Sequence, residues 1–209
     1  MIIQTEVKGY FAENAYYYID DKSGHGFLID PGAQAEGLLA MIKEHGWTIE
    51  KILLTHGHFD HTGAVNALRD ALQVPVYAYE TADRYLLDTR MNLSAACGEH
   101  VIVRDAVHLK DGDTIRLAAD PEFSLKTIYT PGHTTDSVIF YSEKDHAAFV
   151  GDTIFKGSIG NWQYPGGDLR ELQHSIIKRI FTLPDETVLL SGHSDQTTVG
   201  TEKRRYQVS

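Results

Sequence analysis

The stretch that decides the fold of this chain runs Thr55-His56-Gly57-His58-Phe59-Asp60-His61-Thr62-Gly63. Three imidazoles and one carboxylate fall within six residues, directly after an apolar segment over 49–54 that we expect to be a buried strand. Neutral imidazole binds zinc, iron and similar ions, and a carboxylate extends the choice to harder metals. Packing four such groups together without a cation would cost desolvation free energy with nothing to offset it. The stretch therefore predicts a metal site.

The spacing of these residues predicts room for two ions. His56 and His58 are two residues apart, so at an extended strand end their side chains project to the same side. Asp60 and His61 are adjacent, where the chain turns into the helix that we expect over 64–72, so they leave the backbone in other directions. Because zinc takes three or four protein ligands, each half of such a site needs ligands from elsewhere in the chain.

Three later segments offer such ligands. Each is a short apolar run that we expect to be a strand (124–130, 147–150 and 187–190), and each stops at a glycine beside one ligand-type residue. Glycine allows close backbone approach at a tight turn, and ligands at strand ends belong to rigid elements. These three ligand-type residues are His133, Asp152 and His193.

The ordered set His-x-His-x-Asp-His, then a lone His, a lone Asp and a final His, resembles the metallo-β-lactamase superfamily. The further matches Gly151-Asp152-Thr153-Ile154-Phe155, Pro165-Gly166-Gly167-Asp168, Gly192-His193 and 197–203 resemble its glyoxalase II-like branch. The resemblance extends from the N-terminal strands to about Lys203. It implies a mixed α/β fold: a four-layer αββα sandwich, two mixed β-sheets with helices on the outer faces, and the site at one edge. No linker or low-complexity tract divides the chain, so we expect one domain over 1–209.

The resemblance also implies a role for each ligand. One ion would be held by His56, His58 and His133, a second by Asp60, His61 and His193, and Asp152 would bridge the two. The expected cofactors are two divalent metal ions per chain, zinc in the first place and iron or manganese as alternatives, because all three accept these ligands. A water shared by two such ions ionises near neutral pH and attacks a polarised carbonyl. Asp60 and Asp152 are the expected catalytic residues.

The expected reaction is hydrolysis of an activated acyl bond in a small molecule, either a thioester such as hydroxyacyl-glutathione or a lactone or ester. A mononuclear iron persulfide dioxygenase is one alternative, disfavoured because the complete second set of ligands is present. A non-catalytic metal-binding protein is another. Cys97, the only cysteine, precedes His133 and fits no ligand position, unlike the second-site cysteine of common zinc β-lactamases.

The resemblance to true glyoxalase II is incomplete on the side that binds glutathione. Those enzymes carry a further C-terminal helical segment, whereas the printed sequence ends at Ser209. The branch also has a basic residue after the position of Gly160, where this chain has Asn161. Losing a fixed cation removes a partner for a carboxylate, so the substrate need not be a glutathione thioester. The residues that we expect to line the cleft on the substrate side are Lys156, Trp162 and Tyr164.

Composition excludes several other classes of function. The net charge of −10 disfavours a nucleic-acid partner, which normally meets a basic surface. The chain has no apolar run long enough to span a bilayer and no signal-peptide pattern at its N-terminus. A single cysteine favours a reducing compartment, so we expect a cytoplasmic location without membrane association. The sequence leaves the oligomeric state open.

The remaining elements follow from apolar alternation and turn residues. Helical periodicity over 169–183 is strong and stops before Pro184. No element is predicted for 86–99, a segment that we expect could cover the cleft. The other expected strands are 2–7, 16–20, 26–30 and 74–79, and the other expected helices are 35–45 and 81–88.

Overall fold

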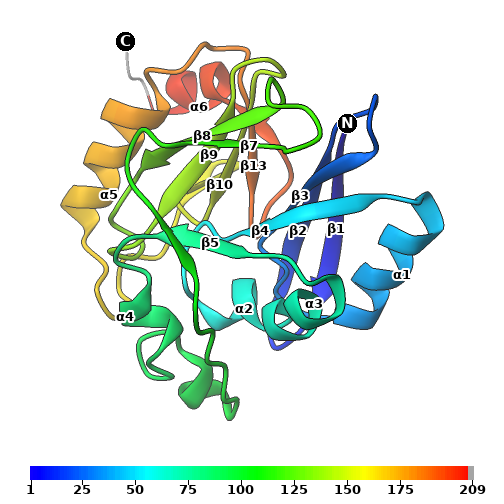
Figure 1. Cartoon of the computed structure of the whole chain (residues 1–209). Helices are drawn as coiled ribbons and strands as arrows, with labels where there is room; N and C mark the ends of the chain where they lie inside the picture. Colours follow the sequence, from blue (N-terminus) through cyan, green and yellow to red (C-terminus); the bar gives the residue numbers. More distant parts are fainter. Residues whose placement is uncertain (207–209) are drawn as a thin grey trace.

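Two six-stranded β-sheets lie face to face, with helices on both outer sides (Figure 1). The structure is a computed structural model and describes residues 1–206. Its layers confirm the predicted αββα sandwich, and the last three residues of the expected domain lie outside the described residues. Within 1–206, none of the helices has the length and apolar character needed to cross a membrane.

Both sheets are mixed. The first is antiparallel from β1 to β3 and parallel from β3 to β6. The second is antiparallel except for its β10–β13 pair. In spatial order the first sheet contains β1 (Ile2–Lys8), β2 (Ala12–Ile19), β3 (His25–Ile29), β4 (Thr48–Leu53), β5 (Val76–Tyr79) and β6 (Val107–Leu109). The second contains β14 (Thr197–Thr198), β13 (Val188–Ser191), β10 (Ala147–Gly151), β9 (Val138–Ser142), β8 (Ser124–Tyr129) and β7 (Thr114–Arg116), and a separate hairpin joins β11 (Ile154–Phe155) to β12 (Ser158–Ile159).

The helices form the outer layers and the connections near the site. The first sheet is covered by α1 (Ala35–His45) and α3 (Val65–Leu72), and the second by α5 (Leu169–Ser175), η2 (Ile176–Ile180) and α6 (Val199–Arg205). Three short helical segments complete the fold: α2 (Phe59–Thr62), α4 (Asp83–Leu86) and η1 (Ser94–Cys97). The helix expected over 169–183 is shorter as an α-helix, because it passes into one π-helical turn, η2.

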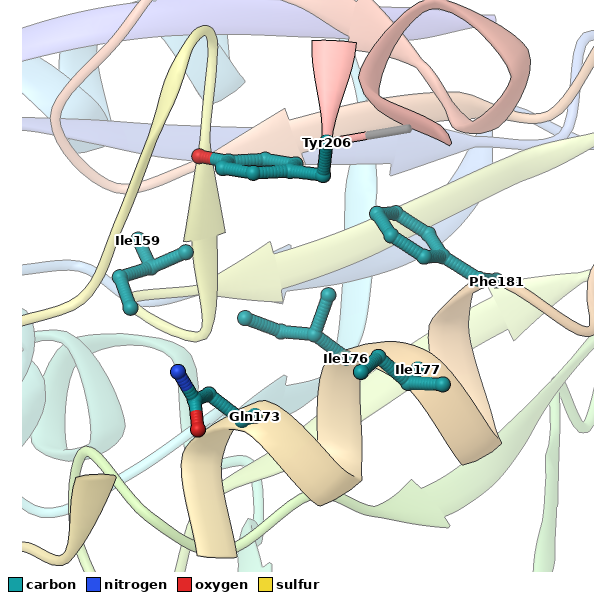
Figure 2. Close-up of a pocket in the computed structure, with 6 residues that line it drawn as sticks. All are labelled: Ile159, Gln173, Ile176, Ile177, Phe181 and Tyr206. Atoms are coloured by element: carbon teal, nitrogen blue, oxygen red, sulfur yellow. The ribbon is translucent and has the colours of Figure 1, made fainter. Parts of the chain in front are cut away.

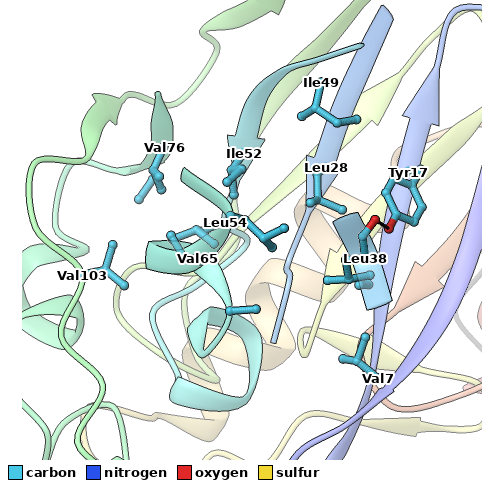
Figure 3. Close-up of a cluster of buried hydrophobic side chains, with 14 of the residues drawn as sticks. Val7, Tyr17, Leu28, Leu38, Ile49, Ile52, Leu54, Val65, Val76 and Val103 are labelled. Atoms are coloured by element: carbon cyan, nitrogen blue, oxygen red, sulfur yellow. Dashed lines mark hydrogen bonds between the residues drawn. The ribbon is translucent and has the colours of Figure 1, made fainter. Parts of the chain in front are cut away.

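Alternation along β2 determines which side chains enter which layer. Tyr16 and Tyr18 face the second sheet, whereas Tyr17 and Ile19 face the helices of the first sheet, as a side-chain period of two requires. Figure 3 shows Tyr17 beside Leu38 of α1, whose carbonyl accepts a hydrogen bond from the tyrosine hydroxyl at 3.0 Å. Both faces of the sheet are thus covered, which explains the nearly continuous apolar run of β2.

The second sheet is buried in the same way. Phe140 and Phe149 pack between the sheets, while Ile139 and Val150 pack against the layer of α5 and η2. All five residues of β9 are buried. This strand is an addition to those predicted, and its apolar run carries the signal for it. By contrast, β6, β7 and β14 are two or three residues long, too short for alternation to identify them.

The turn after β3 packs directly on the histidine-rich motif over 55–63. Pro31 accepts a backbone hydrogen bond from Ala64 at 3.0 Å. A Cβ atom added to Gly32 would lie 1.6 Å from the backbone oxygen of Asp60, so only glycine fits there. The turn therefore holds α2 against the edge of the first sheet.

We expect Gly32→Ala to lower the free energy of unfolding by about 2–3 kcal/mol, because its methyl group would push α2 away from the turn. The matched control is Gly37→Ala in α1, where an added Cβ meets no atom within 4 Å. This control should raise the free energy of unfolding by about 0.5–1 kcal/mol through helix propensity. Urea unfolding of both variants measures the two changes, and equal stabilities would contradict the packing argument.

Candidate metal centre

The residues expected to bind metal come together at one edge of the two sheets. His56 and His58 follow β4, and Asp60 and His61 lie in α2. The other three follow the second sheet's strands β8, β10 and β13, and they are His133, Asp152 and His193. All seven side chains belong to groups whose candidate donor atoms lie within 4.8 Å of one another.

Three buried imidazoles form the first group of donors. His58 Nδ1 lies 3.1 Å from His56 Nε2 and 3.0 Å from His133 Nε2. Two nitrogens bound at about 2.1 Å to one tetrahedral zinc ion would lie roughly 3.4 Å apart. The three nitrogens therefore fit a single ion with only a small expansion of the triangle.

A second group of donors lies beside the first. His193 Nε2 lies 3.3 Å from both His61 Nε2 and Asp60 Oδ2. Asp152 faces both groups: its Oδ1 is 3.4 Å from His61 Nε2, and its Oδ2 is 3.7 Å from His133 Nε2. Oδ1 is buried and accepts no hydrogen bond within the described residues, so it is an acceptor without a partner. The two groups are consistent with a dinuclear metal site, in which Asp152 lies near donors of both groups.

Hydrogen bonds on the far sides of the rings hold most of the imidazoles in place. His133 Nδ1 donates to the carbonyl of Asn161 at 2.8 Å, and His193 Nδ1 donates to that of Ala12 at 2.7 Å. Such outer partners set the tautomer and orientation of a ligating histidine. His58 is the exception, because its outward Nε2 is buried and makes no hydrogen bond within the described residues.

The carboxylate of Asp30 supports the motif from behind. Its Oδ2 accepts from His61 Nδ1 at 3.0 Å, and its Oδ1 accepts from the backbone amide of Thr55 at 2.7 Å. Its backbone has a positive φ of 49°, which is uncommon for a residue with a Cβ. Asp30 is therefore a partner of His61.

Two polar residues at the start of β2 reach the same region and were not expected from the sequence. The side chain of Asn14 donates to the carbonyls of Ser191 and Ser194, both at 3.0 Å, and so holds the loop that carries His193. Glu13 is buried, and its Oε1 lies 3.7 Å from His61 Nδ1. An acidic and an amide residue inside an apolar strand are the signal that could have identified both.

Burial and charge affect the two groups of imidazoles differently. Burial lowers the pKa of His56 and His133 and lowers that of His58 to about 3, so these rings are neutral and able to bind metal. Burial also disfavours the protonated form of His61 and His193. The nearby carboxylates, that of Asp152 above all, outweigh this effect of burial and raise the pKa values of both histidines. Without metal, the protonated form of the imidazole is therefore favoured more strongly in the second group than in the first.

A further buried carboxylate lies behind the motif. Asp136 is fully buried, and a Cβ added to Gly57 would lie 3.2 Å from its Oδ2. Burial raises the pKa of Asp136 to about 7. The sequence contained no pattern that singled out this residue.

The donors open into a cavity of about 290 Å³. Besides the donor residues, its wall is formed by Phe11, Ala12, Leu93, Phe155, Asn161 and Tyr164. Of the residues expected on the substrate side, Tyr164 lies on this wall, with its ring 5.7 Å from that of His58. Lys156 and Trp162 lie outside the wall, and Lys156 pairs with Asp195 at 3.0 Å.

Another hollow, of about 320 Å³, lies between η2, β12 and the end of α6 (Figure 2). It is lined by Ile159, Gln173, Ile176, Ile177, Phe181 and Tyr206. These residues, all within 1–206, include no histidine, cysteine or carboxylate. This hollow therefore offers none of these side chains to bind a metal ion.

We expect the second ion to be released by acid before the first. As the pH falls, protons compete first for His61 and His193, whose pKa values are raised, and only at lower pH for the first group, whose values are lowered. Dialysis at constant free metal followed by elemental analysis should show a fall from two ions per chain to one. The variant His193→Ala should hold one ion throughout. Loss of both ions at a single pH would contradict this difference.

The sequence of this chain is similar to those of known proteins over most of its length. The model of the metallo-beta-lactamase superfamily matches residues 9–193. A probable metallo-hydrolase, YqgX of Bacillus subtilis, is 39% identical over 191 residues, which cover 91% of this chain and 89% of YqgX. The hydroxyacylglutathione hydrolase GloC of Haemophilus influenzae is 32% identical over 197 residues, covering 93% of this chain and 91% of GloC.

Two solved structures are also similar to this chain over nearly its whole length. The B3 metallo-beta-lactamase BLEG-1 has a TM-score of 0.91 and 36% identity, covering 98% of this chain and 97% of its own. TTHA1623, solved in a di-iron-bound form, has a TM-score of 0.86 and 35% identity, covering 97% of this chain and 98% of its own. With its His-rich site and the glyoxalase II-like resemblance supported by GloC, this chain belongs to the metallo-β-lactamase superfamily as a metallo-hydrolase.

Proposed function

We propose that this chain hydrolyses an activated acyl bond of a small molecule, in the first place a thioester. The observation that carries the proposal is the position of Asp152, which faces both groups of donors beside an open cavity. Two cations held in this way would share one carboxylate and expose one face to a substrate. A hydrolase of this kind needs no serine or cysteine nucleophile.

The proposed cofactors are two divalent ions, zinc in the first place, with iron or manganese as alternatives. When bound, such a pair makes a shared water nucleophilic and stabilises negative charge on a carbonyl oxygen. The similar protein TTHA1623 has been solved in a di-iron-bound form, which supports a site for two ions and keeps iron among the candidates.

The chain's own residues would contribute positioning and charge. Asp152 would hold the two ions at a fixed separation. Asp60 would orient the attacking water, since its carboxylate lies beside His193 and also lines the cavity. Although burial opposes ionisation of Asp60, its hydrogen bond with His193 and the charge of His61 lower its pKa, so it remains an acceptor at neutral pH. His61 in turn is oriented by Asp30, at 3.0 Å.

The acyl class of the substrate is supported by two relatives. GloC is named as a hydroxyacylglutathione hydrolase, which is a thioesterase, and 93% of this chain aligns with it. The similarity to BLEG-1, a B3 metallo-beta-lactamase, favours a second candidate: hydrolysis of a strained cyclic amide. Both reactions add water to a carbonyl, so the same donors could serve either.

The test is a substrate panel on purified protein whose metal content has been measured. We expect turnover of thioesters above that of lactones, β-lactams and phosphoesters. Asp60→Asn should lower kcat by about 100-fold or more, because the water loses its acceptor. The matched control is Asp70→Asn, whose carboxylate is largely exposed on α3 and should leave kcat unchanged.

Other outcomes separate the alternatives. Faster turnover of β-lactams than of thioesters would favour the second candidate. One iron per chain with oxygen uptake on persulfides would indicate a dioxygenase. Two bound ions with no turnover of any substrate, and no effect of Asp60→Asn, would indicate a protein that only binds metal.

A further inference from the structure

Leu93 has a backbone conformation that leucine rarely adopts. Its φ is +72°, in the left-handed region, where a Cβ atom crowds the following carbonyl. Such a conformation persists only when the surrounding structure determines it, and it is often found at functional sites. Leu93 belongs to the segment 86–99, for which the sequence predicted no element.

The residue before it holds this conformation in place. Asn92 is buried, its side-chain oxygen accepts from the amide of Ser94 at 3.0 Å, and its side-chain amide donates to the carbonyl of Val101 at 2.7 Å. The backbone carbonyl of Asn92 accepts from the amide of Phe59 at 3.0 Å. Because Phe59 lies between His58 and Asp60 in the sequence, this hydrogen bond joins the turn at Leu93 directly to the histidine-rich motif over 55–63.

This turn places Leu93 on the wall of the cavity, where His58 and Asp60 also lie. The wall is otherwise largely aromatic, with Phe11, Phe155 and Tyr164. Among the described residues that line it, none is lysine or arginine. An anionic substituent beside these aromatic residues would lose hydration without gaining an ammonium or guanidinium partner, whereas an apolar one would gain from burial.

The size of the cavity limits what can lie against this wall. Its volume of about 290 Å³ is at the lower end of the range of roughly 300–1,000 Å³ found for small-molecule sites. The acyl substituent is attached to the carbonyl carbon that must approach the ions. The leaving group is bonded to the same carbon, and a cavity of this volume accommodates one of the two groups against the wall while the other extends toward solvent.

We propose that Leu93 is a specificity-determining residue that restricts the substrate to a small, uncharged acyl group. The inference rests on the proposed acyl hydrolase function and extends it to the substrate class. A glycine would adopt this backbone conformation without strain, so leucine here supplies a wall that the turn itself does not need.

The experiment compares thioesters of one thiol with acetyl, butyryl, hexanoyl and octanoyl groups. In Leu93→Gly and Leu93→Ala, we expect the ratio of kcat/KM for hexanoyl to that for acetyl to rise about tenfold, mainly through KM. Leu93→Met keeps the volume and should leave the ratio unchanged. The matched control is Leu87→Ala, because Leu87 is exposed on the same segment and lies outside the cavity wall.

Two further measurements separate failure of this inference from failure of the proposed function. Metal content and thermal unfolding show whether each variant is folded and loaded, and Leu93→Gly should fold because glycine fits the turn. If the wild type hydrolyses thioesters but the chain-length ratio is the same in folded, loaded variants, Leu93 does not set specificity. If the wild type hydrolyses none, the proposed function fails. Calorimetry then measures the binding of carboxylates with the same chain lengths. A change of the preferred chain length in Leu93→Gly supports the inference, and an unchanged preferred length overturns it.

Discussion

The packing of histidine side chains around the carboxylate of Asp152 is the interaction on which the rest of the structure depends. Burial disfavours the charged form of every one of these groups, and only neighbouring charge or a bound cation can offset it. Asp152 achieves part of this offset, because burial would raise its pKa but the imidazoles of His61 and His193 lower it. The two groups of donors are therefore coupled before any ion binds.

This coupling requires loops from both sheets to be held in register. Asn14, in the first sheet, binds the loop after β13 of the second. Thr55, just before the motif, accepts a hydrogen bond from the amide of Val138 at 2.8 Å. Gly151 allows the other sheet to approach, since a Cβ there would lie 2.2 Å from the hydroxyl of Thr55. The site is thus built at the junction of the sheets, and its geometry depends on the same contacts as the fold.

The cavity has a different character from the donors beneath it. Apart from Asn161, its wall is hydrocarbon and aromatic, and the strained turn at Leu93 belongs to it. Strain of this kind is retained where surrounding hydrogen bonds hold it, here those of Asn92. The donor side chains at the base of the cavity can hold cations, and the wall above them is largely apolar. This combination suits reaction at a carbonyl group whose substituent is uncharged.

The αββα layers were implied by the resemblance to the superfamily, whereas the sequence by itself determined most strands, α1 to its last residue, and the seven residues that the structure brings together at the candidate metal centre. It could do so because the signals are local: six residues contain four donors, and short apolar runs end at glycine beside the other three. The partners behind the donors needed the tertiary structure. Asn14 and Ser191 are 177 residues apart, and the role of Asp30 became clear only once β3 paired with β4. The tertiary structure also decided that Tyr164 lines the cavity while Lys156 and Trp162 do not. Periodicity and spacing encode what a segment can bury, but contacts between distant segments follow from how the buried faces pack together.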